Sequence, residues 1–77
     1  MPPKLPRISG EEAIRALKRL GFEVVRQRGS HVVLKKRVSI EEEIGCVVPL
    51  HDKLGIGLLH NILKQARVTT EEFIKQL

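Results

Sequence analysis

The residues of this sequence that could transfer protons beside a polyanion gather within positions 26–37. His31 follows the flexible pair Gly29-Ser30 and opens the apolar run 32–34. Histidine has an unperturbed pKa close to neutral pH, so its imidazole can both accept and donate protons there. The same stretch contains five cations and no acid: Arg26, Arg28, Lys35, Lys36 and Arg37. Because clustered cations attract the phosphates of nucleic acids, the stretch predicts recognition or cleavage of RNA.

Each of these features also has a purely structural explanation. A lone histidine at the start of a strand is more often a turn or hydrogen-bonding residue than a catalyst. A basic run such as Lys35-Lys36-Arg37 is commonly a solvated strand that resists edge-to-edge pairing. From these residues alone, nucleic-acid binding is therefore a stronger prediction than catalysis.

The charge of the whole chain supports a polyanionic partner. The formal net charge is +5, and it is unevenly distributed. Residues 1–40 hold ten Lys and Arg against three Glu, a balance of +7, whereas residues 41–77 hold four against six acids, a balance of −2. This asymmetry predicts a basic face for nucleic acid. The only aromatic residues are Phe22 and Phe73, which argues against a base-stacking platform and favours contacts to phosphate and sugar.

Length and cysteine content limit the classes of protein further. Seventy-seven residues, 42% of them hydrophobic, predict one folded domain with a small core. The single cysteine, Cys46, excludes an internal disulfide and a multi-cysteine zinc site, and its apolar neighbours at 44–48 predict a buried thiol. No stretch is apolar over a membrane-spanning length and no signal-peptide pattern is present, so we expect a cytoplasmic protein without a membrane partner.

Two capping boxes mark the starts of helices. Ser9 with Glu12 predicts a first helix, whose apolar stripe is Ala13, Ile14, Leu17 and Leu20 and which ends at Gly21. A second helix is expected after the glycine-containing loop 49–57, with a stripe of Leu58, Leu59, Ile62, Leu63 and Ala66. Thr69 with Glu72 predicts a short last helix, with Phe73 and Leu77 on its core side.

Three strands are predicted between the first two helices. Residues 22–27 and 31–36 should form a hairpin around Arg28-Gly29, and residues 44–48 should form a third strand that ends at Pro49. Alternation in the second strand places His31, Val33 and Lys35 on the face opposite Val32 and Leu34. The acidic run 41–43 is expected in a solvated turn, with a patch for a basic partner as the alternative. We expect residues 9–77 to form a single domain after an extended basic arm, residues 1–8.

Several landmarks of this chain occur together in one known family: Leu20-Gly21-Phe22, the segment 26–31 that ends in Gly29-Ser30-His31, Val48-Pro49-Leu50-His51, Gly57, the segment 62–66 and Glu71-Glu72-Phe73. From about residue 8 to residue 77 the chain resembles the HicA family, the toxin half of HicA–HicB toxin–antitoxin pairs. The resemblance implies an α+β fold like that of a double-stranded-RNA-binding domain, with a three-stranded antiparallel sheet and helices packed on one face.

The resemblance also implies an activity and its partners. It implies the toxin of a type II toxin–antitoxin system, a metal-independent endoribonuclease that cleaves mRNA without a cofactor. A HicB-type antitoxin would be the protein partner. The toxin would form either a homodimer or a hetero-oligomer with the antitoxin. The family's catalytic histidine corresponds to His31, and the expected RNA-binding residues are Arg26, Arg28, Gly29, Ser30, Lys35 and Lys36.

Cleavage by histidine needs two proton transfers, and His31 covers one of them. It would act either as general base on a ribose 2′-hydroxyl or as general acid to the leaving oxygen. The other transfer is left open to His51, a lysine, the second chain of a dimer or water. Two other classes of protein remain: a non-catalytic RNA-binding module of the same fold, and an interaction protein whose basic face docks an acidic partner.

Overall fold

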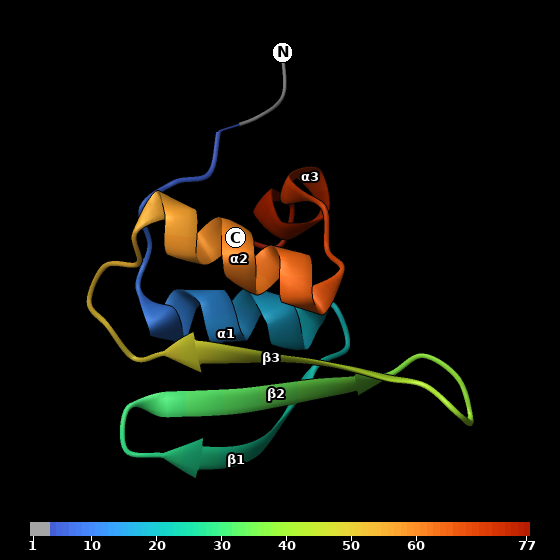
Figure 1. Ribbon diagram of the computed structural model, residues 1–77. Helices are drawn as coiled ribbons and strands as arrows, with labels where there is room; N and C mark the ends of the chain where they lie inside the picture. Colours follow the sequence, from blue (N-terminus) through green and yellow to red (C-terminus); the bar gives the residue numbers. More distant parts are fainter. Residues whose placement is uncertain (1–3) are drawn as a thin grey trace.

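The secondary structure follows the capping and turn residues closely. The computed structural model describes residues 4–77 (Figure 1). Its elements in chain order are α1 (Gly10–Arg19), β1 (Glu23–Arg28), β2 (His31–Arg37), β3 (Glu43–Pro49), α2 (Ile56–Ala66) and α3 (Thr70–Ile74). This order confirms the predicted α+β class with a three-stranded antiparallel sheet. Residues 1–3 of the predicted N-terminal arm lie outside the described residues.

Both predicted capping boxes are present. The Ser9 hydroxyl accepts a hydrogen bond from the Glu12 amide, and the Glu12 carboxylate accepts one from the Ser9 amide. Thr69 and Glu72 repeat this exchange at the start of α3. The hydrogen bond from the Thr69 amide, followed by that from its hydroxyl, lowers the pKa of the Glu72 carboxyl. These caps satisfy amides at helix starts that have no partner within the helix.

The sheet has the order β1-β2-β3, so β2 is the central strand. The β1–β2 hairpin turns at Gly29-Ser30, where Gly29 adopts a φ of +54°. At this end of the sheet His31 lies opposite Arg28 on β1 and opposite Pro49 on β3. The pairing of β1 with β2 shifts between Val24 and Arg26, which marks a bulge in the outer strand.

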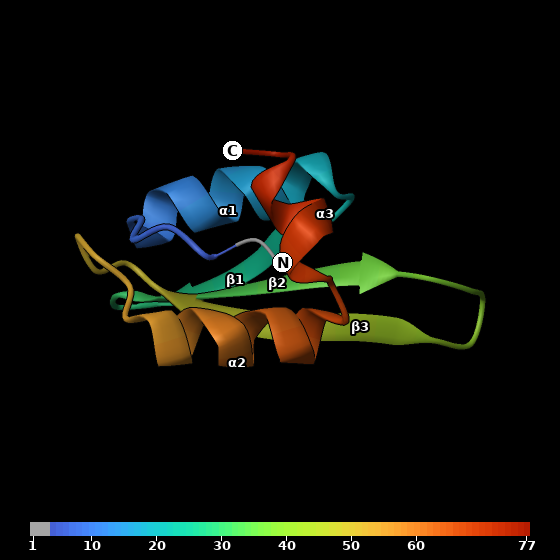
Figure 2. The ribbon, with the colours of Figure 1, turned by 90° about the horizontal axis from the view of Figure 1, so that it is seen from above.

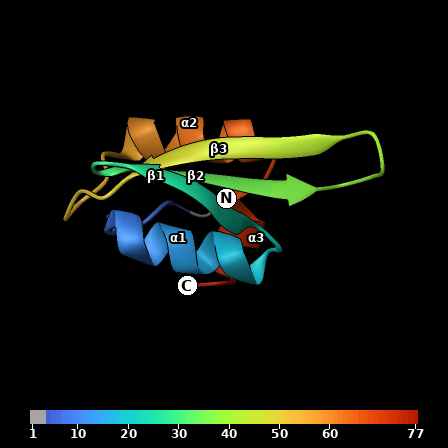
Figure 3. The same ribbon diagram turned by 90° about the horizontal axis from the view of Figure 1, so that it is seen from below.

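The core lies on one face of the sheet. Alternate residues of β2 and β3 are buried, namely Val32, Leu34, Cys46 and Val48. The helices contribute Ala13, Ala16, Leu17, Leu59, Ile62, Leu63, Ala66 and Phe73 to the same cluster. Figure 2 shows α1 and α2 running along the strands. In the opposite view (Figure 3), β1 is nearest the viewer, and no helix of the described chain passes in front of the sheet.

Two predicted core residues are exposed. Leu58 is 39% exposed, because α2 begins at Ile56 and packs on the sheet through Leu59, which lies about 100° further around the helix. Leu77 is 47% exposed, because α3 ends at Ile74 and the helical periodicity that would place Leu77 on the core side stops there. Conversely, Leu5 and Ile8 of the predicted arm are each only 7% exposed and belong to the core.

The β2–β3 connection is solvated, as predicted for the acidic run. Ile40 at its tip is 91% exposed, and the Glu42 carboxylate lies 3.5 Å from the Arg67 guanidinium. The helices of residues 4–77 are all too short or too polar to serve as a transmembrane segment.

Candidate nucleic-acid interface and active site

One face of the sheet carries His31 and most of the cations of residues 26–37. The exposed residues of β2 alternate with its core residues and include His31 and Lys35, with half-buried Val33 between them. On β1 their cross-strand partners are Arg28 opposite His31, Arg26 opposite Val33 and Glu23 opposite Lys35. Because no helix among residues 4–77 covers this side, we call it the open face. It is defined by His31, Val33 and Lys35 of β2 together with their partners on the neighbouring strands.

The structure brings three of the predicted RNA-binding cations together on the open face. Arg26, Arg28 and Lys35 are all exposed there, and Glu23 is the acid nearest to Lys35 in the strand register. Lys36 is separated from them, because its position in β2 points to the helix side. Its ammonium lies 5.9 Å from the centre of the Phe22 ring, which is part of the core.

His31 occupies the end of the open face and is exposed to solvent. The turn before it is held by Gln27, whose Nε2 donates a hydrogen bond of 2.9 Å to the Gly29 carbonyl. Residues directly opposite each other in antiparallel strands have Cβ atoms about 5 Å apart, so the Arg28 guanidinium can reach a phosphate placed at the imidazole. The imidazole is therefore accessible to a polymer that lies across the sheet.

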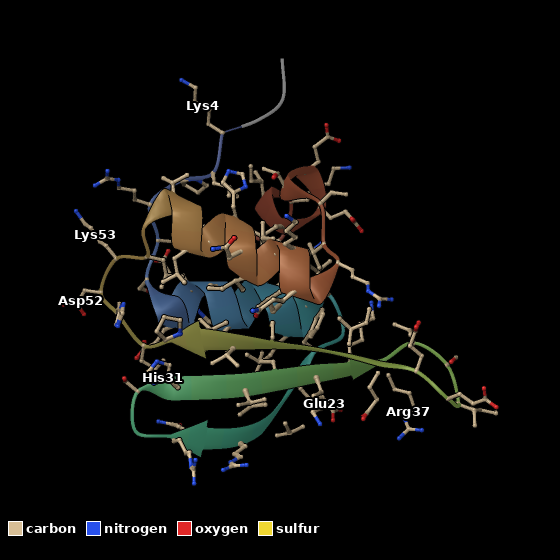
Figure 4. The ribbon with its side chains drawn as sticks, in the orientation of Figure 1. Lys4, Glu23, His31, Arg37, Asp52 and Lys53 are labelled. Carbon is tan, nitrogen blue, oxygen red and sulfur yellow. The ribbon has the colours of Figure 1, made fainter. Side chains whose placement is uncertain are left out.

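The loop after β3 lies at the same end of the sheet. The Leu50 amide donates a hydrogen bond of 2.7 Å to the carbonyl of Ser30, the residue that precedes His31. Figure 4 shows His31 at the same end of the molecule as Asp52 and Lys53 of this loop, with Glu23 and Arg37 toward the other end. His51, the other histidine predicted for the site, belongs to this loop and is exposed.

Two further backbone hydrogen bonds hold that loop against the N-terminal part of the chain. The Gly10 amide donates to the His51 carbonyl at 2.9 Å, and the Leu54 amide donates to the Ile8 carbonyl at 2.7 Å. The Leu54 side chain is fully buried in the core. The backbone of His51 is thus fixed from both sides.

Gly10 is a positioning residue that sequence reasoning missed. A Cβ atom added there would lie 2.0 Å from the Pro49 carbonyl oxygen, so only glycine allows α1 to approach the end of β3 this closely. The sequence shows Gly10 only as the residue after a helix cap. Nothing in the local pattern indicates that another segment packs on it.

The remaining chemical groups of the structure lie apart from His31. Burial raises the pKa of the Cys46 thiol to about 11, so the thiol stays protonated at neutral pH and is a poor nucleophile. Within residues 4–77, no three side chains of the His, Cys, Asp or Glu type are grouped so that they could hold a metal ion. A groove lined by Gly21, Glu23, Val25, Lys35, Arg37 and Glu43 lies toward the far end of the open face.

Comparison with known protein families gives a match that covers most of the chain. Residues 10–68 match the family model described as the HicA toxin of bacterial toxin–antitoxin systems. No curated protein matches the sequence. The matched segment runs from the start of α1 past the end of α2, so it includes the whole sheet, both candidate histidines and the loop that joins them. The chain therefore belongs to the HicA family, the toxins of toxin–antitoxin systems whose partner is an antitoxin.

Proposed function

We propose that this toxin is an endoribonuclease that cleaves mRNA through acid–base catalysis by His31. The observation that carries the proposal is the position of His31, exposed at the end of the open face and beside Arg28. A proton-transfer group next to fixed cations on an uncovered surface suits a phosphodiester of a long polyanion.

In the proposed reaction the ribose 2′-oxygen attacks the adjacent phosphorus. The bond from the 2′-oxygen to phosphorus forms, and the bond from phosphorus to the 5′-oxygen of the next nucleotide breaks. The products are a 2′,3′-cyclic phosphate and a 5′-hydroxyl. One proton leaves the 2′-hydroxyl and one reaches the 5′-oxygen, and His31 performs one of these transfers.

The cations of the open face have two separate roles in this proposal. Arg28 stabilises the negative charge that develops on the phosphate oxygens, because it is the cross-strand partner of His31. Arg26 and Lys35 hold the RNA backbone across the sheet through phosphate contacts. This division requires no metal ion, so we expect cleavage to persist when EDTA removes divalent cations.

The antitoxin would act on the same surface. An acidic antitoxin that covers the open face would neutralise the same cations and block access to His31. Inhibition and RNA binding should therefore be mutually exclusive.

Expression of the toxin in bacteria tests the proposal. Wild-type protein should arrest growth and fragment mRNA, whereas His31→Gln should do neither while accumulating as a folded protein. His60→Gln is the matched control, because His60 is exposed on α2 and lies in a hollow formed with residues of the α2–α3 connection. RNA binding without cleavage by either the wild type or His31→Gln would instead identify a binding module.

A further inference from the structure

The cleavage proposed above needs a second proton-transfer group, and the loop after β3 supplies a candidate. We propose that His51 performs the proton transfer that His31 does not, so that the two imidazoles act on opposite sides of one phosphate. This inference rests on the proposed ribonuclease function and assigns the other half of its chemistry.

The first observation is that the backbone brings the two histidines to one place. His31 is paired with Pro49 across β2 and β3, and His51 follows Pro49 by two residues. The hydrogen bond of 2.7 Å from the Leu50 amide to the Ser30 carbonyl joins the residues that immediately precede the two histidines. Both imidazoles are exposed at this end of the sheet.

The second observation is that the loop around His51 is anchored to the rest of the fold, although the His51 side chain is exposed. The carbonyl of His51 accepts a hydrogen bond from the Gly10 amide, and three residues later Leu54 is buried and bonded to Ile8. Catalytic groups gain efficiency when the backbone holds them close to the reacting geometry. The anchoring on both sides of His51 provides that support.

The other candidates for the second transfer fit less well. Lys35 lies four residues along β2 from His31, a separation of about 13 Å between Cα atoms in an extended strand. Lys53 belongs to the same loop as His51, but an ammonium group is less suited than an imidazole to proton transfer at neutral pH. His60 is the remaining histidine of the chain, and it is in a hollow with Val68, Thr69 and Thr70 near α3.

The reaction requires the two imidazoles to be in opposite protonation states at the start. The neutral one accepts the proton of the 2′-hydroxyl as the bond from the 2′-oxygen to phosphorus forms. The protonated one donates its proton to the 5′-oxygen as the bond from phosphorus to that oxygen breaks. Water then restores the two starting states through proton exchange, and no electron transfer is involved.

The test compares His31→Gln, His51→Gln and the control His60→Gln on a defined oligoribonucleotide. The cleavage position is first mapped with the wild type. We expect His51→Gln to lower the single-turnover cleavage rate by about 10²- to 10⁴-fold, the usual contribution of one acid or base, and His60→Gln to change it less than about threefold. The fold should survive in His51→Gln, because its loop is held through backbone atoms, and circular dichroism checks this.

A second substrate identifies the role of each histidine. It carries sulfur in place of the 5′-oxygen at the mapped position, and the thiolate leaves without being protonated. The variant that lacks the general acid, either His31→Gln or His51→Gln, should cleave this substrate at a rate within about tenfold of the wild type. The other variant, which lacks the general base, should stay impaired.

Three results would overturn the inference. His51→Gln could cleave the natural substrate within about threefold of the wild type, or neither variant could recover on the sulfur substrate, or both could recover. In each of these cases the proposed function would still stand if wild type and His60→Gln cleave the natural substrate and His31→Gln does not. If the wild type itself cleaves no RNA, both the function and the inference are wrong.

Discussion

Substitution of Gly10 by alanine should separate the geometry of the site from its chemistry. The added Cβ would lie 2.0 Å from the Pro49 carbonyl oxygen, and Cβ atoms essentially never approach other heavy atoms closer than 3.0 Å. The start of α1 or the end of β3 must therefore move by at least about 1 Å, as the difference between these two distances shows. That movement also strains the hydrogen bond from Gly10 to the His51 carbonyl.

The expected loss of stability follows from two opposing effects. Overpacking of this kind costs about 1–3 kcal/mol, whereas replacing glycine by alanine in a helix stabilises it by about 0.5–1 kcal/mol. We expect a net decrease of about 1–2 kcal/mol in the free energy of unfolding. A displacement of about 1 Å at a catalytic group can lower the rate about 10²-fold, so cleavage should fall by more than the small change in the folded fraction explains.

Gly57→Ala is the matched control for this substitution. Gly57 lies in the first turn of α2, and a Cβ added there meets nothing within 4 Å. It should therefore stabilise the protein by about 0.5–1 kcal/mol and leave the cleavage rate unchanged. Urea unfolding and single-turnover cleavage measure both effects. If Gly10→Ala proves as stable and as active as Gly57→Ala, the close approach of α1 to β3 is not what holds the loop.

Three further substitutions test the charge distribution and the buried thiol. Affinity for single-stranded RNA falls with salt, and Arg26→Gln should reduce the magnitude of the slope of log affinity against log salt by about 0.7. Lys36→Gln, on the helix side, should leave that slope unchanged. Equal slopes for the two variants would contradict the assignment of the open face. The pKa of Cys46 is raised from 9.0 to about 11, so the folded state binds the thiol proton more tightly than the unfolded state. The resulting stability is complete below pH 9.0 and declines as the pH rises toward 11, by up to about 2–3 kcal/mol. Urea unfolding of the wild type should therefore lose stability in this range relative to Cys46→Ala, and parallel pH profiles would disprove it.

Local sequence signals predicted the elements of this fold well. The capping residues Ser9 and Thr69 each mark the start of a helix, because a side chain that satisfies free amides acts within four residues. Alternation along β2 correctly divided its residues between the core and the open face, because successive side chains of a strand point to opposite faces and this is also a local property. Leu58 and Leu77 were placed wrongly because their burial depends on where a helix begins or ends.

The site was only partly predictable, since it depends on contacts between distant segments. His31 and its neighbouring cations are adjacent in sequence and could be recognised together. The importance of Gly10 lies in a contact with Pro49, and no local pattern reports on a contact over that separation. The position of His51 beside the hairpin likewise depends on two contacts between distant segments. The Leu50 amide donates a hydrogen bond to the Ser30 carbonyl, and the Gly10 amide donates one to the His51 carbonyl.

Cleavage of a defined RNA by purified protein tests the central role of His31 most directly. Wild-type toxin in EDTA should produce fragments that end in a 2′,3′-cyclic phosphate, and His31→Gln should cleave at least about 10²-fold more slowly with unchanged affinity for the RNA. Equal cleavage by the two proteins, or fragments that end in a 5′-phosphate, would contradict acid–base catalysis by this histidine.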